Sequence, residues 1–228
     1  MEKADLHDIY LEIGTKKVFA SAVQWPGWCR SGRDEESAIQ ALLDYAPRYS
    51  RLLEPAELAF VIPKIPRELV ITERVKGGAG TDFGAPGMSI RGDQDQPSPE
   101  EVERYKRVFQ AAWMAFDRAV KAAEGRQLRK GPRGGGRELA GILEHVAGAD
   151  LSYLSSLGWK VKPSSNVDLP EQFDFIRSEI LKGIDAAAGG QLPAVGPKGG
   201  KKWPLRFFAR YATWHVVDHT WEIEDRIL

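Results

Sequence analysis

WPLRFFARYATWHVVDHTWEIEDRIL, residues 203–228, is the stretch from which the fold is best worked out. It contains no glycine, and its one proline, Pro204, lies in the first turn, where a helix does not need the amide donor. We therefore expect one long helix. His215 and His219 are four residues apart, so both imidazoles project from one face and can reach one metal ion. Two ligands do not make a stable site, and two polar residues on an amphipathic helix are the simpler interpretation of this pattern alone.

Composition limits the class of protein. The 228 residues are enough for one large domain or two small ones. The formal net charge is zero, which gives no bias toward nucleic acid or an anionic membrane surface. No window approaches the ~18 apolar residues of a membrane span, and no signal peptide is evident. Cys29 is the single cysteine and cannot form an internal disulfide. We expect a cytoplasmic protein that has neither nucleic-acid nor membrane partners.

The N-terminal part predicts strand, strand, turn and helix in that order. Residues 8–23 have two apolar runs around a Gly-Thr pair, which is typical of a hairpin. Pro26-Gly27 indicates a turn. Asp34 is a suitable N-cap for the following helix, and we expect that helix to end or kink at Pro47.

Two more runs are rich in valine and isoleucine, residues 58–62 (LAFVI) and 68–75 (ELVITERV). They predict strands that complete a sheet of four. Residues 77–97 are rich in glycine and aspartate, and we expect a loop or linker there with neither a helix nor a long strand. Neither glycine pattern of nucleotide-binding loops occurs in this segment. Phe83 could dock on a pocket, or the segment could be a plain linker.

The turn and the helix start carry a family resemblance. An extended strand, P-G-x-x-x-x-G and an acidic E-x-A helix start are matched by Pro26, Gly27, Gly32, Glu36 and Ala38. This short stretch resembles the HicB-like antitoxin N-terminal domain. The resemblance implies a small αβ fold that can bind a partner ribonuclease. We use it as a prediction of fold and not of antitoxin activity.

Four amphipathic helices are expected after residue 98. The first begins at Ser98, where Glu101 completes a capping box, and continues with an apolar stripe. The other three are expected at residues 137–157, 171–188 and 203–228. Four helices of such length suggest a four-helix bundle.

The expected architecture is therefore α+β. A small αβ domain with the HicB-like resemblance covers residues 1–76, and a glycine-rich linker covers residues 77–97. The four-helix bundle covers residues 98–228.

His145 is the candidate third ligand. Its neighbours on the face of its apolar helix are Gly141, Gly148 and Ala149. Such small residues favour a pocket, although the glycines equally allow close helix contact. If this face meets the H-x-x-x-H face, three imidazoles converge, which is the ligand set of a catalytic zinc-type site. Histidine also suits nickel, iron or copper.

The segment before this helix is basic and rich in glycine. It contains Arg129, Arg133 and Arg137. Arginines near a helix N-terminus can bind an anion. A solvated loop, whose charges offset acidic groups elsewhere, is an equally open interpretation.

The second half carries a further family resemblance. The matching residues are His145, Val146, Ala149, Asp150, Tyr153, His215 and His219. With H-V-x-x-A-D-x-x-Y in its second helix and H-x-x-x-H in its fourth, the bundle resembles the DinB/YfiT-like superfamily. The resemblance implies a divalent metal, zinc or nickel, on the three histidines, and homodimers are frequent. It also implies a small-molecule substrate and an activity such as thiol-dependent S-transfer or hydrolysis. The sheet domain is not part of the family's minimal pattern and puts the shape of the substrate pocket in doubt.

Other residues receive expected roles around this site. Glu222 follows His219 by three residues on the same face, so it could be a general base, an orienting partner of a histidine, or part of a surface salt bridge. Tyr153 is the second catalytic candidate through the family pattern. Asp150 points off the metal face. The basic arginines could bind a carboxylate of a low-molecular-weight thiol.

Two functions remain open at this point. The first is a metal-dependent enzyme of the thiol S-transferase or hydrolase type. The alternative is a non-catalytic binding or regulatory protein, in which the HicB-like half docks a partner and the bundle serves as a scaffold.

Overall fold

The sheet is built around the predicted hairpin. The computed structural model describes residues 6–130, 136–162, 167–196 and 199–228. In it β1 (His7–Ile13) pairs antiparallel with β2 (Val18–Ala22), as expected. β2 pairs antiparallel with β3 (Cys29–Gly32), and β1 pairs parallel with β4 (Leu69–Lys76). The strand order is therefore β3-β2-β1-β4 in a mixed sheet.

The prediction of a strand at residues 58–62 was wrong. This run has no regular structure, and the ring of Phe60 lies 5.0 Å from Trp28 and 5.2 Å from Tyr49. Its side chain therefore joins an aromatic cluster instead of a strand ladder. The fourth strand of the sheet is instead β3, which was not predicted. It is four residues long and has no β-branched residue to indicate it.

α1 (Glu35–Leu53) covers one face of the sheet. Asp34 caps it by accepting from the amide of Ser37, as predicted. Its expected end at Pro47 was wrong, because the helix continues for another six residues. Pro47 is on the exposed side and removes one amide donor, whereas Tyr49 in the next turn is fully buried.

Gly32 of the P-G-x-x-x-x-G pattern has a steric role. A Cβ atom there would lie 2.3 Å from the amide nitrogen of Ala38. Only glycine allows the end of β3 to approach the first turn of α1 so closely.

The glycine-rich segment is anchored at several points and contains a short helix, contrary to expectation. α2 (Ala79–Phe83) and a 3-10 turn at Arg91–Gln94 interrupt it. Thr81 donates to the buried carboxylate of Glu12 at 2.5 Å, and the amide of Met88 donates to the same group at 2.9 Å. Phe83 is 91% exposed, so its ring occupies no pocket in this structure.

Four long helices follow, as predicted. They are α3 (Pro99–Ala123), α4 (Leu139–Leu157), α5 (Leu169–Ala188) and α6 (Leu205–Arg226). The capping box of Ser98 and Glu101 at the start of α3 is present. Among the residues described, no helix is both long and apolar enough to cross a membrane.

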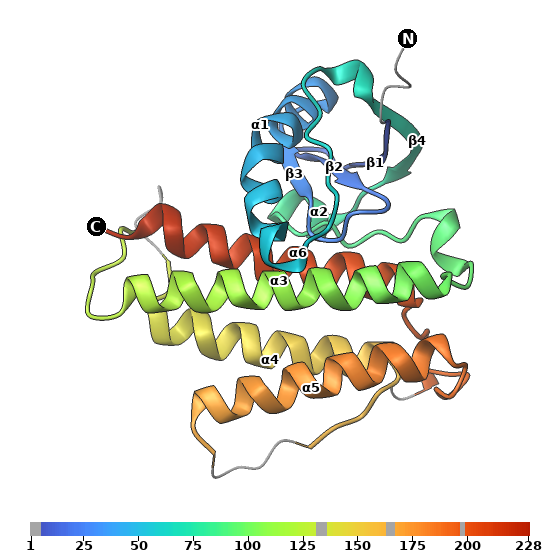
Figure 1. Ribbon diagram of the computed structural model, residues 1–228. Coiled ribbons are helices and arrows are strands. Elements are labelled where there is room, and N and C mark those ends of the chain that lie inside the picture. The colour runs from blue at the N-terminus through green and yellow to red at the C-terminus, as the bar shows by residue number, and fades with distance from the viewer. Residues whose placement is uncertain (1–5, 131–135, 163–166, 197–198) are drawn as a thin grey trace.

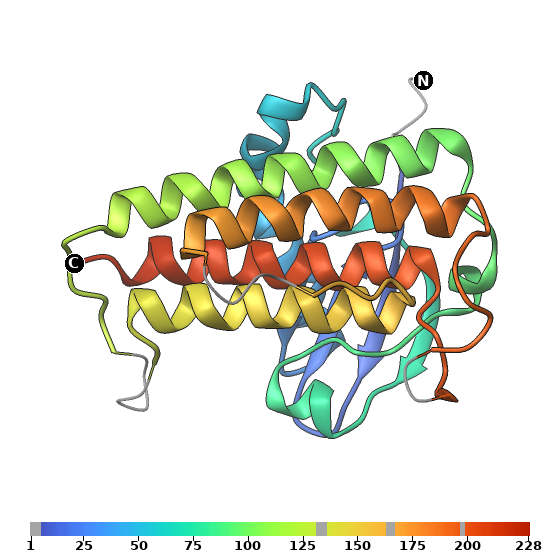
Figure 2. The same ribbon diagram turned by 90° about the horizontal axis from the view of Figure 1, so that it is seen from below.

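α6 and α3 lie side by side between the N-terminal αβ part and the other two helices of the bundle, α4 and α5 (Figure 1). Around the bundle the neighbours follow the order α3, α6, α4, α5 (Figure 2). α6 runs parallel to α3, because Arg206 at its start pairs with Glu101 at the start of α3. It runs antiparallel to α4, because Tyr153 in the second half of α4 contacts Tyr211 in the first half of α6.

One continuous core joins the two parts of the chain. It includes Leu11 of β1, Leu42 of α1, Phe109 of α3 and Phe208 of α6. The second face of the sheet also meets α6, since Phe19 packs edge-on against Trp214. Because one face of α6 packs against the sheet, a different face of this helix is available to contact α4.

Candidate metal centre

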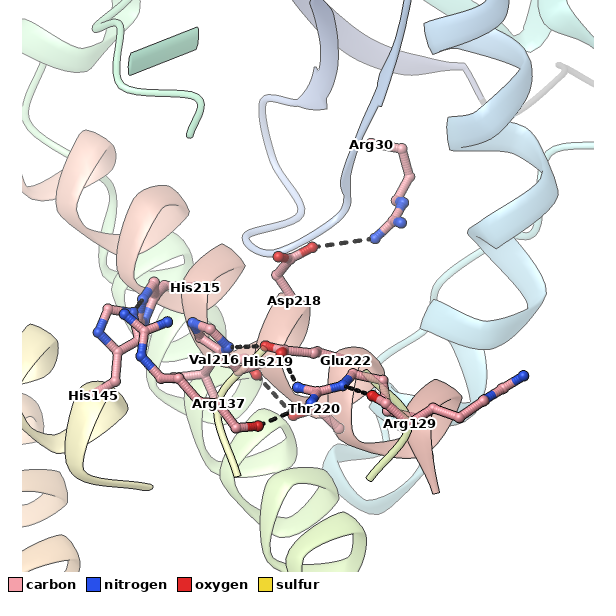
Figure 3. A network of polar contacts seen from close by, with 11 residues as sticks. Arg30, Arg129, Arg137, His145, His215, Val216, Asp218, His219, Thr220 and Glu222 are labelled. Atoms are coloured by element: carbon pink, nitrogen blue, oxygen red, sulfur yellow. Dashed lines mark hydrogen bonds and ion pairs between the residues drawn. The ribbon is translucent and has the colours of Figure 1, made fainter. Parts of the chain in front are cut away.

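The predicted histidines meet where α6 crosses α4. His215 is 6% exposed and points from α6 toward α4. Its Nε2 lies 3.1 Å from Nε2 of His145. The ring of His219, one turn further along α6, has its centroid 4.5 Å from that of His215 and 4.9 Å from that of His145. Both helices thus present their imidazoles to the same point (Figure 3).

The spacing of the three donors fits a single ion. One ligand atom from each histidine can be chosen so that all three lie within 4.8 Å of one another. Two nitrogens bound to a tetrahedral zinc ion at ~2.05 Å each are roughly 3.3 Å apart. The 3.1 Å between His145 and His215 is close to that separation. These three histidines could therefore hold a metal ion.

Burial keeps the imidazoles of His145 and His215 neutral. Burial, together with His219, His145 and Arg137 nearby, lowers the pKa of His215 to about 2. Partial burial also lowers the pKa of His145. The Nδ1 atom of His215 is buried with no hydrogen-bond partner among the described residues. Neutral imidazole is the form that donates an electron pair to a metal.

Glu222 contacts a candidate ligand directly. Its carboxylate accepts from Nδ1 of His219 at 2.7 Å and from Nη1 of Arg226 at 2.5 Å. The hydrogen bond from His219 and the other contacts lower the pKa of Glu222. A proton on Nδ1 of His219 leaves Nε2 as its ligand atom. The geometry is that of a carboxylate that orients a metal-binding histidine.

Tyr153 lies beside the histidines on α4. Its ring is perpendicular to that of His215 at 5.4 Å and stacks on Trp203 at 5.5 Å. Burial raises the pKa of its phenol, which therefore stays protonated at neutral pH. Tyr211, one turn before His215, closes the same aromatic wall at 5.1 Å from Tyr153. Trp203 was not identified from the sequence, because its indole reaches Tyr153 only through the packing of α4 on α6.

The three predicted arginines have different positions. Arg137 extends toward His145 and His215, and its charge lowers the pKa of both (Figure 3). Arg129 lies at the end of α6, where Nη2 donates to the carbonyl of Asp225 at 2.7 Å. Arg133 lies outside the described residues. Only Arg137 of the described pair therefore adjoins the histidines.

The two glycines near His145 have different surroundings. A Cβ atom at Gly141 would meet the Cβ of Arg137 at 3.4 Å, and one at Gly148 would meet nothing within 4 Å. Gly141 thus lies against the first turn before α4. Gly148 faces open space away from the core.

Arg226 is the residue that the sequence did not reveal. Its guanidinium donates to Glu222 at 2.5 Å, to the carbonyl of Arg129 at 2.7 Å and to the carbonyl of Arg137 at 2.9 Å. Only its i, i+4 spacing from Glu222 is visible in the sequence, and that spacing is common on helix surfaces. The two carbonyl contacts form because the chain before α4 lies against the end of α6.

Two acids near the histidines point elsewhere. Asp218 faces the sheet, where its carboxylate lies 3.5 Å from Nη1 of Arg30 (Figure 3). Asp150 is 2% exposed, and burial raises its pKa to about 8. Its carboxylate lies near Arg177 of α5, whose charge acts in the opposite direction on this pKa.

Comparison of the chain with known protein families, with curated proteins and with solved structures found no match. Support for a function therefore comes from the geometry of the site and from the motif resemblance of the helical bundle.

Proposed function

We propose that this protein is a metal-dependent enzyme of the thiol S-transferase or hydrolase type, as its resemblance to the DinB/YfiT-like superfamily implies. His145, His215 and His219 would hold a divalent ion, zinc or nickel. The observation that carries the proposal is the convergence of three imidazole donors within 4.8 Å at the contact of two helices.

The donor set suits such an ion. His145 and His215 are kept neutral by their surroundings, and His219 is oriented by Glu222. Three histidine ligands leave a fourth position for a reactant. An ion held there would lower the pKa of a bound water or thiol and would so supply a nucleophile at neutral pH.

The surrounding side chains supply binding and orientation. Glu222 holds the Nδ1 proton of His219 and fixes the direction of its ring. The protonated phenol of Tyr153 is a hydrogen-bond donor for negative charge that develops beside His215. Arg137 offers a cation for an anionic group of the substrate, such as a carboxylate of a low-molecular-weight thiol.

Metal analysis of the protein purified without chelator tests the proposal. We expect ~1 zinc or nickel per chain, as a three-ligand site predicts. Less than about a tenth of an ion per chain, with no change in the His145→Ala variant, would count decisively against it. Conjugation of a thiol to an electrophile, compared with ester or amide hydrolysis by the loaded protein, then separates the two reaction types.

The alternative as a partner-docking protein has less support. α1 covers one face of the sheet, and α6 with the 77–97 segment packs on the other, as the contacts of Phe19 and Glu12 indicate. A pull-down with the intact chain tests partner binding. Light scattering tests the homodimer that the family resemblance implies.

A further inference from the structure

Arg226 joins three separate parts of the chain at the metal centre. Its side chain is 12% exposed in the last turn of α6. Nη1 donates to Glu222, Nε to the carbonyl of Arg129 and Nη2 to the carbonyl of Arg137. All three nitrogens of the guanidinium are therefore used.

Two of these acceptors, Glu222 and the carbonyl of Arg137, belong to residues of the proposed site. Glu222 holds His219, so the position of its carboxylate decides where the ring of that histidine points. The carbonyl of Arg137 belongs to the residue whose own guanidinium extends toward His145 and His215. Arg226 thus fixes both an orienting carboxylate and the backbone that carries the nearest cation.

The chain leaves room for this contact at a glycine. Gly136 has φ +131°, a conformation that favours glycine. A Cβ atom there would lie 2.7 Å from Nη2 of Arg226. The close approach of the two segments therefore needs a residue without a side chain at position 136.

We propose that Arg226 is a positioning residue that holds Glu222, and through it His219, in the geometry required to bind the metal. The inference rests on the proposed function, because it assumes that the three histidines bind an ion. Loss of a group that orients a metal ligand typically weakens metal affinity by about 10–100-fold.

Arginine is required by the geometry of the acceptors. Its planar guanidinium donates in several fixed directions at once, whereas a lysine ammonium is a compact point charge. Arg226→Lys keeps a positive charge near Glu222 and loses the fixed bonds to the carbonyls of Arg129 and Arg137. Arg226→Gln loses the charge as well.

Arg48 offers a matched control. It reaches from α1 to the same last turn of α6 and pairs with Glu224 at 2.5 Å and Asp225 at 2.9 Å. Arg48→Gln therefore removes an arginine fork from the same helix end without touching Glu222. It separates loosening of the helix end from loss of orientation at His219.

The test is titration of the full-length chain with Co²⁺, which reports binding through its visible absorption. We expect Arg226→Gln and Glu222→Gln each to weaken Co²⁺ binding by about 10–100-fold. The double variant should bind no more weakly than Glu222→Gln, because the two residues act in one chain of contacts. Arg48→Gln should bind Co²⁺ within about twofold of the native chain. Circular dichroism verifies that each variant is folded.

Each outcome decides the question. Native affinity in Arg226→Gln, or an equal loss in Arg48→Gln, would overturn the role of Arg226 while metal binding by the native chain stands. If the native chain itself binds no Co²⁺, the proposed function fails first. If Arg226→Gln does not fold, Arg226→Lys replaces it, and its native-like affinity and visible spectrum would overturn the proposal.

Discussion

Two buried polar clusters on α6 differ in the kinds of group that they bring together. Arg210 donates through both terminal nitrogens to Asp93, with one of these bonds at 2.8 Å. The two side chains are 6% and 0% exposed, and their charges are opposite. Asp93 also accepts from the amide of Ile90 at 2.8 Å. In this cluster opposite charges of the protein face each other, and the ion pair fixes the 77–97 segment on α6.

The histidine cluster has a different composition. His145, His215 and His219 are groups of one kind, and two of them direct nitrogens at each other. The first cluster pairs protein groups of opposite charge, whereas the second gathers lone pairs that suit a cation. The type of donor, more than burial, therefore distinguishes a structural cluster from a candidate metal site.

The largest effect on metal content is expected when the second cluster is broken. His215→Ala should reduce the metal content from ~1 per chain to below about a tenth. It should also abolish the rise in thermal stability on adding Zn²⁺, which is worth about 2.7 kcal/mol at a hundred times the dissociation constant. Elemental analysis and thermal melts measure both effects. An unchanged Zn²⁺ response in the variant would remove His215 from the site.

A large effect on the free energy of unfolding is expected when the first cluster is broken. Arg210→Met leaves the carboxylate of Asp93 buried and without its cation, and should lower the free energy of unfolding by about 3–5 kcal/mol. Urea titration measures the loss. Arg206→Met provides the control, because its pair with Glu101 is more exposed and should matter less. Loss of metal from a still-folded Arg210→Met protein would contradict the separation of the two clusters.

Asp150 is a buried acid that belongs to neither cluster. Its folded-state pKa of about 8 lies above the unfolded value, so its contribution to stability is present below pH ~4 and is lost as pH rises toward 8. We expect the unfolding free energy to fall by about 1–3 kcal/mol between pH ~5 and pH ~7.5. Asp150→Asn should flatten this dependence in urea titrations at both pH values. An equally steep slope in the variant would assign the effect to other groups.

The smallest effect concerns the end of α6. Arg48→Gln removes ion pairs to Glu224 and Asp225, whose side chains are 41% and 55% exposed. Such pairs contribute at most about 1 kcal/mol to stability. Metal content should not change, and a drop in the folded variant would link this helix end to the histidine cluster.

The helices and the candidate ligands were predictable because their signals are local. The capping box at Ser98 and the spacing of His215 and His219 lie within one turn of helix, and both are present in the structure. His145 could be proposed as the partner because it lies among the apolar positions of its helix, with small residues beside it. Which helices are neighbours was not predictable from these patterns.

The errors arose where distant contacts outweigh local preference. Phe60 lies in an aromatic cluster in place of a strand, and α1 continues past Pro47 because Tyr49 beyond it is buried. The role of Arg226 depends on two carbonyls about ninety residues earlier in the chain. No pattern within a single helix contains that information.

The central place of α6 has a consequence for biosynthesis. Phe208 belongs to the shared core, and Trp214 lies against the sheet through Phe19. α6 is synthesised after every other element described here. On the ribosome the sheet and α3–α5 therefore expose the surfaces that α6 later covers. Chaperone dependence of this protein should therefore centre on the interval before Leu205 leaves the exit tunnel.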